Sequence, residues 1–311
     1  MNNRENKYDH MILRAEDKAI NWYPGHMARA KRKLMEQLSR VDVVVELCDA
    51  RIPRASRNPD LNDLIKNKKR LLVLNKADLA DESQTRAWLA YYRAQGIDCM
   101  SFDSAKGRAK DVVSRIEKAA SEAVAKMAAK GVKKTVRVMI VGVPNVGKST
   151  FTNKVNGSSI AKTGDRPGVT RNNQWVRITP YLELLDTPGL LWPKLDDQQD
   201  ARALAFVGTI NDQITDQQML AVRLLEMLME MKPDAAIQRF KLKDASLRGV
   251  ALLEEACRGR GWLMPGGVMD TDRGAAVILD EFRAGKLGRL TLQKAPEMKA
   301  AVIIKEQEKE Q

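Results

Sequence analysis

The chain has 311 residues, of which 44% are hydrophobic and 30% charged, so it is long enough for two domains that each bury a core. Its longest apolar runs, Val43 to Val45 and Val138 to Val141, are far too short to cross a bilayer, and residues 1–18 lack the apolar core of a secretion signal. Lys and Arg outnumber Asp and Glu by 53 to 40, and the net charge of +13 favours a polyanionic partner, with a merely solubilising surface charge as the alternative.

Along the chain, residues 1–20 are predicted to form a flexible arm, and a basic segment after Met27 is predicted to form a helix that ends near Ser39. Apolar strands then alternate with helices. The predicted strands are Val41 to Cys48, Arg70 to Leu74, Ile97 to Phe102 and Val136 to Val141, followed by a hairpin of Gln174 to Ile178 and Leu182 to Leu185. The predicted helices are Pro59 to Lys66, Glu82 to Gln95, Ala109 to Lys130 and one that starts near Lys148. This alternation indicates an α/β fold with a mostly parallel, doubly wound sheet.

After residue 195 the strand pattern ends, and three segments have helical periodicity: Gln217 to Met231, Leu247 to Cys257 and Arg273 to Ala284. We therefore expect a small all-α domain after the α/β domain. The predicted divisions are an arm at 1–20, an α/β domain at 21–194, a helical domain at 195–292 and a polar tail at 293–311.

A phosphate-binding loop follows the strand that ends at Val141. Residues Gly142 to Ser149 read G-x-x-x-x-G-K-S, the pattern whose backbone N–H groups surround phosphate oxygens at the start of a helix. Lys148 is expected to reach the β- and γ-phosphates, and the Ser149 hydroxyl to bind Mg²⁺. The residues expected to contact the nucleotide here are Asn145, Val146, Gly147, Lys148, Ser149 and Thr150.

Two further elements fit the γ-phosphate side of such a site. Asp186-Thr187-Pro188-Gly189 follows an apolar strand, which suits an aspartate that holds Mg²⁺ through water and a glycine that meets the γ-phosphate. Thr170 lies between this motif and the phosphate loop, where a threonine that closes on Mg²⁺ and the γ-phosphate is expected in a first switch. An ordinary loop hydroxyl is the competing interpretation of Thr170.

The base is predicted by Asn75-Lys76-Ala77-Asp78, which also follows a strand. A carboxylate at Asp78 can accept hydrogen bonds from N1–H and the 2-amino group of guanine, whereas adenine offers no such pair of donors. Ser104-Ala105-Lys106, after the next strand, would complete the pocket through a backbone N–H near the guanine oxygen. Because each motif stands at the carboxyl end of a strand, where α/β sheets bind ligands, the sequence predicts GTP rather than ATP.

The order of these motifs is inverted, because the guanine-reading tetrapeptide precedes the phosphate loop instead of following it. A parallel-sheet domain tolerates such rejoining of its chain, since the packed core is unchanged. Leu190 occupies the position where many GTPases carry a glutamine that orients water, and leucine cannot do so. We therefore expect slow intrinsic hydrolysis that depends on another group, an ion or a partner.

With these motifs, the chain resembles the circularly permuted ribosome-assembly GTPases of the RbgA/YlqF type over residues 21–290. The most specific shared elements are Trp22-Tyr23-Pro24-Gly25-His26-Met27, the permuted order, Gly142 to Thr150, and Asp186 to Pro193. The resemblance implies a GTPase that acts late in assembly of the large ribosomal subunit and is stimulated by that particle. It also implies that the helical domain binds RNA.

The resemblance assigns roles to two residues. His26 would take part in hydrolysis in place of the missing glutamine, with a conformational role as the rival interpretation. Asn145 would help to bind K⁺ beside the β- and γ-phosphates, with loop capping as the alternative. The expected cofactors are thus GTP or GDP, Mg²⁺ and K⁺, and the expected catalytic residues are His26, Lys148 and Thr170.

Basic residues outside the nucleotide motifs could contact rRNA phosphates or simply form solvated helix faces. Those near the N-terminus are Arg29, Lys31, Arg32 and Lys33, and those toward the C-terminus are Arg248, Arg258, Arg260, Arg273, Arg283, Lys286 and Arg289. No RNA-stacking aromatic motif accompanies the second group, so recognition of backbone and shape is expected.

Three functional hypotheses remain. The first is a cytoplasmic, monomeric GTP-hydrolysing assembly factor that binds precursors of the large ribosomal subunit and rRNA, without membrane or DNA. The second is an RNA-binding switch whose hydrolysis is incidental, which Leu190 favours somewhat. The third, a membrane or vesicle GTPase, is opposed by the lack of lipidation motifs. The three cysteines share no ligand spacing, so no chemistry is assigned to Cys48, Cys99 or Cys257.

Overall fold

The structure is a computed structural model that describes residues 32, 35–59, 61–65, 68–157, 174–187, 197–211 and 215–297. The chain divides into two compact units. One, here called the nucleotide unit, comprises Tyr23–Trp192 and Arg289–Gln311. The other, here called the helical unit, comprises Pro193–Gly288.

The nucleotide unit is built on a six-stranded sheet with the strand order β3-β2-β1-β4-β6-β5. The strands are β1 (Val43–Asp49), β2 (Lys69–Asn75), β3 (Cys99–Phe102), β4 (Val136–Gly142), β5 (Gln174–Thr179) and β6 (Leu182–Asp186). Only β5 runs antiparallel to its neighbour, because it forms a hairpin with β6. The central strand β1 is buried along its whole length, as expected of a strand paired on both edges and covered on both faces.

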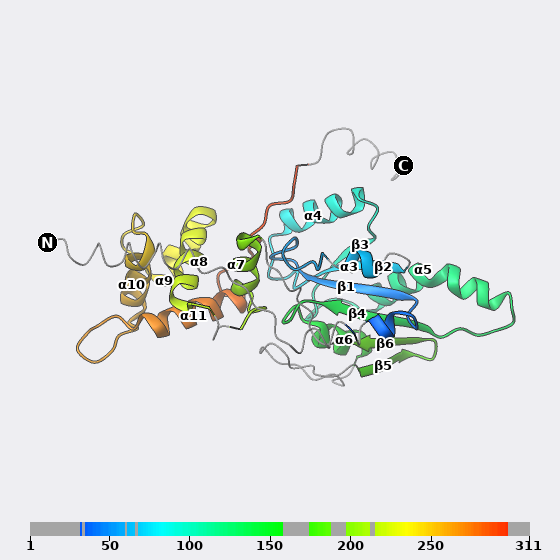
Figure 1. Cartoon of the computed structure of the whole chain (residues 1–311). Helices are drawn as coiled ribbons and strands as arrows, with labels where there is room; N and C mark the ends of the chain where they lie inside the picture. The colour runs from blue at the N-terminus through cyan, green and yellow to red at the C-terminus, as the bar shows by residue number, and fades with distance from the viewer. Residues whose placement is uncertain are drawn as a thin grey trace. The chain divides into compact units, whose positions relative to one another are not determined.

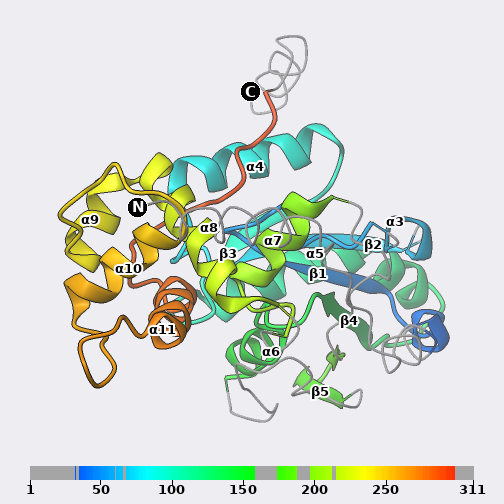
Figure 2. The ribbon, with the colours of Figure 1, turned by 60° about the vertical axis from the view of Figure 1, so that its left-hand side comes forward.

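Helices cover both faces of this sheet: α3 (Leu61–Leu64), α4 (Glu82–Ala94), α5 (Ala109–Ala128) and α6 (Lys148–Asn156). Figures 1 and 2 show α4 and α6 on opposite sides of the strands. Trp88, Leu89 and Tyr92 of α4 pack against apolar side chains of β1, β2 and β3 in one buried cluster. Burial of these rings and aliphatic chains holds α4 in place, and with it the loop that leads out of β2.

The helical unit contains α7 (Gln198–Phe206), α8 (Gln217–Met231), α9 (Pro233–Phe240), α10 (Gly249–Arg260) and α11 (Thr271–Arg283). Aspartate side chains cap the first turns of α7, α8 and α11, where they accept hydrogen bonds from backbone N–H groups. α8 packs against α9, α10 and α11, and its buried leucines, among them Leu220, Leu224 and Leu228, form the centre of this unit.

The predicted fold class, a mostly parallel α/β sheet followed by a helical region, is confirmed. Two helices, α7 and α9, were not predicted. α9 follows α8 so closely that Lys232 ends one helix and begins the other. No described helix is long and apolar enough to span a membrane.

The boundary of the helical unit also differs from the predicted one. The unit ends at Gly288, whereas the sequence pattern placed the end at residue 292. Residues 289–295 hydrogen-bond to the nucleotide unit instead, and this includes Gln293 and Ala295 at the start of the predicted polar tail. Periodicity could not show this, because an irregular segment carries no repeat.

Candidate nucleotide-binding site

The three predicted nucleotide motifs come together at the carboxyl ends of β4, β2 and β3, and Asn75 joins them. The Asn75 amide nitrogen donates to the Val146 carbonyl at 2.9 Å. The Ser104 hydroxyl donates to the Asn75 amide oxygen at 2.7 Å. One buried amide therefore fixes the phosphate loop and the Ser104 loop against the guanine-reading tetrapeptide, across 71 and 29 residues of sequence respectively.

Lys76 links the guanine-reading tetrapeptide to the phosphate loop and to the end of β1. It adopts a left-handed backbone conformation with φ 57°, which a non-glycine residue keeps only where its surroundings enforce it. Its ammonium group donates to the Asn145 carbonyl at 2.6 Å and lies 3.3 Å from the Asp49 carboxylate. The aliphatic stem of Lys76 is thereby held beside the phosphate loop, where a purine ring can lie against it.

Beneath Lys76 is a buried ion pair of Asp49 and Arg51, both 1% exposed. Asp49 accepts three hydrogen bonds from Arg51, at 3.0, 3.0 and 2.9 Å. Burial alone would raise the pKa of Asp49, but the charges of Arg51 and Lys76 and the hydrogen bonds outweigh it and hold the pKa well below its usual value. Asp49 is therefore a permanent anion under the base-reading loop.

Glycine is required where the phosphate loop meets Asn75. Gly147 has φ 94°, and a Cβ atom there would lie 2.7 Å from the Asn75 amide nitrogen. A Cβ at Gly142 would lie 2.5 Å from the Leu47 carbonyl oxygen of β1. The loop can lie this close to its neighbours only because both positions lack side chains.

Lys148 is 6% exposed at the first position of α6. Its ammonium group donates to the carbonyls of Gly142 and Val143, at 3.2 and 3.0 Å. Burial lowers the pKa of Lys148 to about 8, against the opposing effect of Asp186. Phosphate oxygens placed in the loop would stabilise the charged form, so this lysine is poised to bind an anion.

Ser149 and Asp186 form a pair suited to a hard cation. The Ser149 hydroxyl donates to one Asp186 carboxylate oxygen at 2.9 Å, and the other oxygen, Oδ1, is buried without a hydrogen-bond partner among the described residues. Burial raises the pKa of Asp186, opposed by Lys148 and Ser149. A divalent cation with its water ligands would satisfy the orphaned oxygen, so the residues present fit Mg²⁺ at this position.

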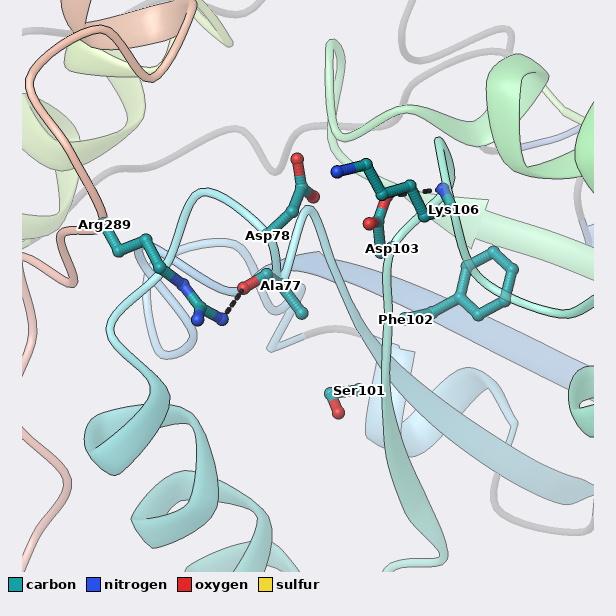
Figure 3. Close-up of a pocket in the computed structure, with 7 residues that line it drawn as sticks. All are labelled: Ala77, Asp78, Ser101, Phe102, Asp103, Lys106 and Arg289. Atoms are coloured by element: carbon teal, nitrogen blue, oxygen red, sulfur yellow. Dashed lines mark hydrogen bonds between the residues drawn. The ribbon is translucent and has the colours of Figure 1, made fainter.

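The base side of the site is shaped by two further loops. Asp103 accepts hydrogen bonds from the backbone N–H groups of Ala105 and Lys106, at 2.7 and 3.0 Å, and Lys154 of α6 donates to the Ala105 carbonyl at 2.8 Å. Asp78 is exposed. Beside it lies a pocket of about 460 Å³, whose lining residues Figure 3 shows as Ala77, Asp78, Ser101, Phe102, Asp103, Lys106 and Arg289.

The structure thus brings together the predicted residues of the phosphate loop, the Asn75 tetrapeptide, the Ser104 tripeptide and Asp186. Thr150 is in α6 and exposed. Asn145 has φ 59° and contacts Lys76 through its carbonyl, a contact that neither prediction for its side chain anticipated. Three predicted residues, His26, Thr170 and Gly189, lie outside the described residues, as does Leu190.

Sequence reasoning missed Asp49 and Arg51 near the site, and it considered Arg289 only as a possible RNA contact or surface cation. Asp49 had a usable signal, because it ends an apolar strand at the same sheet edge as Asn75, its partner in the β1–β2 register. Arg51 follows two residues later and provides the buried counter-charge. Arg289 had no local signal, since its neighbours form neither a strand nor a motif.

Several of the arginines considered as possible RNA contacts also have partners within the fold. Arg283 donates to the carbonyls of Phe206 and Ala205, at 3.1 and 3.0 Å. Arg258 pairs with the buried Glu255, and Arg260 lies 3.9 Å from Glu281. These side chains have structural partners, so their charge is only partly available to a polyanion.

The fold and the site define a P-loop GTPase whose motifs are circularly permuted. A family profile described as "50S ribosome-binding GTPase" matches residues 137–244. The chain is 46% identical to Ribosome biogenesis GTPase A of Priestia megaterium over 275 residues, which are 88% of this chain and 96% of that protein. It is 31% identical to the Thermotoga maritima protein of that name over 276 residues, which are 88% of this chain and 94% of that one.

Among solved structures, the GNP-bound YlqF of T. maritima aligns with a TM-score of 0.63 at 27% identity, over 87% of this chain and 100% of that chain. The GDP-bound form aligns with a TM-score of 0.62 at 28% identity. The chain belongs to the Ribosome biogenesis GTPase A family, and the resemblance inferred from its motifs is confirmed. Membership of this family supports the binding of guanine nucleotides and the hydrolysis of GTP by this chain.

Proposed function

We propose that the protein is a GTP-hydrolysing assembly factor of the large ribosomal subunit that binds precursor particles and rRNA in the cytoplasm. The observation that carries this proposal is the joining of three permuted guanine-nucleotide motifs by Asn75, in a chain whose relatives are named as ribosome biogenesis GTPases. The net charge of +13 supports a polyanionic partner.

The proposed chemistry is attack of water on the γ-phosphate. Lys148 would bind the β- and γ-phosphates, while Ser149, Thr170 and Asp186 would hold Mg²⁺, whose positive charge would offset the charge that develops on the phosphoryl group. Support comes from the buried ammonium of Lys148 beside the loop carbonyls and from the buried Asp186 oxygen. Asp78 selects guanine, and Gly189 meets the γ-phosphate.

Two further proposed roles concern the orientation of the attacking water, which the leucine side chain of Leu190 cannot provide. His26 orients or activates the attacking water, and Asn145 would help to hold K⁺ beside the phosphates, where the ion would supply positive charge to the transition state. The left-handed backbone of Asn145, bound by Lys76, supports a fixed position for this residue. A GTPase that lacks the water-orienting glutamine is expected to depend on the ribosomal particle and on K⁺ for turnover. We further propose that the protein acts as a monomer.

The proposed coupling to RNA follows from connectivity. The switch motif that begins at Asp186 leads to the helical unit, which starts at Pro193. Loss of the γ-phosphate is therefore proposed to reposition the helical unit on rRNA, which it would recognise by backbone and shape. Hydrolysis would then end one stage of assembly.

The test is GTP turnover with and without precursor particles of the large subunit, in K⁺ and in Na⁺ buffer. We expect turnover to rise at least about tenfold with particles and to fall in Na⁺, because the ion and the particle replace the missing glutamine. The chain has two histidines, so His10→Ala is a matched control for His26→Ala. Fast turnover that is indifferent to particles would overturn the proposal.

A second candidate is an RNA-binding switch in which the nucleotide only sets conformation, and Leu190 favours it because leucine cannot orient water. The His26→Ala variant separates the two. If hydrolysis is lost, GTP binding is kept and assembly still proceeds normally, the switch is correct; if assembly stalls with the loss of hydrolysis, the hydrolytic factor is correct.

A further inference from the structure

Residues 289–295 follow the helical unit along the chain and bind to the nucleotide unit next to the guanine-reading tetrapeptide. Leu290 and Thr291 are buried, at 4% and 2% exposure. The segment hydrogen-bonds to the loop after β1 and to the loop after β2, the two loops that carry Arg51 and Asp78. A segment outside every nucleotide motif therefore forms part of the wall behind the base pocket.

Arg289 spans the turn that contains Asp78. Its Nε donates to the Ala80 carbonyl at 3.0 Å and its Nη2 to the Ala77 carbonyl at 3.1 Å. Figure 3 shows the Ala77 contact beside the Asp78 carboxylate. One planar guanidinium thus links the two ends of a four-residue turn, a geometry that the single ammonium group of lysine does not reproduce.

The backbone of the segment completes this contact. The Leu290 N–H donates to the Leu79 carbonyl at 3.0 Å, and the Asp81 N–H donates to the Thr291 hydroxyl at 3.1 Å. Three carbonyls and one N–H of residues 77–81 therefore depend on the segment for their hydrogen bonds. Each group left unpaired would destabilise this conformation of the turn.

Asp78 needs this support because its own side chain has none. The carboxylate is exposed, and no hydrogen bond or ion pair from it to another described residue is found. Its direction is set through the backbone of the turn. The two hydrogen bonds to N1–H and the 2-amino group of guanine require that direction to be held closely.

The link from the helical unit to this segment has no spare length. The Lys286 N–H donates to the Glu281 carbonyl at 2.9 Å and the Gly288 N–H to the Gly285 carbonyl at 3.2 Å, both within the helical unit. Arg289, the next residue, already contacts Ala77 and Ala80 of the nucleotide unit. Arg289 therefore follows directly on the last residue of the helical unit along the chain.

We propose that residues 289–292 position the guanine-reading turn and that Arg289 is a positioning residue for discrimination between purine bases. The ligand is a guanine nucleoside diphosphate or triphosphate, and the residue acts on base recognition through the position of Asp78. The inference rests on guanine-nucleotide binding alone, so it stands or fails independently of any ribosomal partner.

A plain surface role for Arg289 is the main competitor. Its Nη1 lies 3.6 Å from Glu82 Oε2, with the two side chains 50% and 63% exposed. Exposed pairs of this kind contribute little. Arg86 contacts the same glutamate at 3.1 Å and is 70% exposed, so it offers a matched control that shares the ion pair but not the carbonyls of the turn.

The experiment measures the dissociation constants of GDP and of IDP for the full-length protein and its Arg289→Ala, Arg289→Lys and Arg86→Ala variants. Inosine keeps N1–H but lacks the 2-amino group, so the ratio of the two constants reports how well Asp78 reads guanine. We expect Arg289→Ala to weaken GDP binding about tenfold and IDP binding about twofold, which lowers the ratio of the IDP dissociation constant to the GDP dissociation constant about fivefold. Arg86→Ala should keep the ratio of the wild type.

Melting curves of the variants show whether a loss of binding comes from general unfolding. If Arg289→Ala melts well below the wild type, the result is taken from Arg289→Lys, which keeps the charge and one contact and should lower the ratio by an intermediate amount. Equal losses for GDP and IDP, or an unchanged ratio in a variant that melts like the wild type, would overturn the proposal.

Discussion

Asp49→Asn should destabilise the nucleotide unit by about 3 kcal/mol, although the two side chains have the same shape. Asp49 and Arg51 are each 1% exposed, so the substitution removes the negative charge that a buried guanidinium faces. Loss of one partner of such a pair typically costs about 3 to 5 kcal/mol. The low end applies because the asparagine oxygen can still accept from the Arg51 backbone N–H and Nε.

Hydrogen exchange of the intact protein measures this locally. A loss of about 3 kcal/mol corresponds to about a hundredfold drop in the protection of amides in β1 and β2. Peptides from α8, in the helical unit, serve as an internal reference. Asp98→Asn is the matched control, because the Asp98–Arg115 pair is about 40% exposed on both sides and should contribute under about 1 kcal/mol.

The stabilisation that Asp49 contributes also depends on pH. Since the pKa of Asp49 is held below its usual value, its stabilisation is fully present above the pKa of an unfolded aspartate, about 3.9, and is lost as pH falls toward the lower, folded value. The difference between wild type and Asp49→Asn should therefore be constant above about pH 5 and shrink in stronger acid. Equal protection of both proteins at pH 7 would refute the role assigned to this pair.

One further substitution tests the nucleotide site, and one chemical treatment tests the burial of the core. Gly147→Ala should abolish measurable nucleotide binding, because φ 94° and a Cβ 2.7 Å from the Asn75 amide both oppose a side chain; calorimetric titration with GDP checks this, and wild-type affinity would contradict it. The thiols of Cys48, Cys99 and Cys257 are buried, and burial raises their pKa values to about 12, 11 and 11, so alkylation should be slow until unfolding; rapid modification of the folded protein would show that the burial is wrong.

Much of the nucleotide unit could be predicted from sequence because its signals are local. Strands β1, β2 and β4 are rich in buried aliphatic residues, and β2 and β4 end at motifs whose chemistry fixes their place at the sheet edge. The permuted order of the motifs did not obscure this, because the sheet order depends on which strands pair and not on where the chain begins.

The missed features depend on contacts between distant residues. Arg289 contacts carbonyls 209 and 212 positions earlier, and no spacing rule relates them. Likewise, the sequence placed Asn75 in the guanine-reading tetrapeptide but did not show that its amide joins two other loops. Arg283 reads as a surface cation in sequence, but it satisfies backbone carbonyls at the end of α7.

The most direct test of the proposed function isolates this GTPase from others that accompany ribosomal particles. Asp78→Asn should exchange guanine for xanthine, because an asparagine amide can donate to the 2-oxo group of xanthine and accept from its N1–H. We predict that XTP hydrolysis by this variant rises at least about tenfold when precursor particles of the large subunit are added in K⁺ buffer. A variant that binds XDP but turns over XTP at one rate with and without particles would contradict the account.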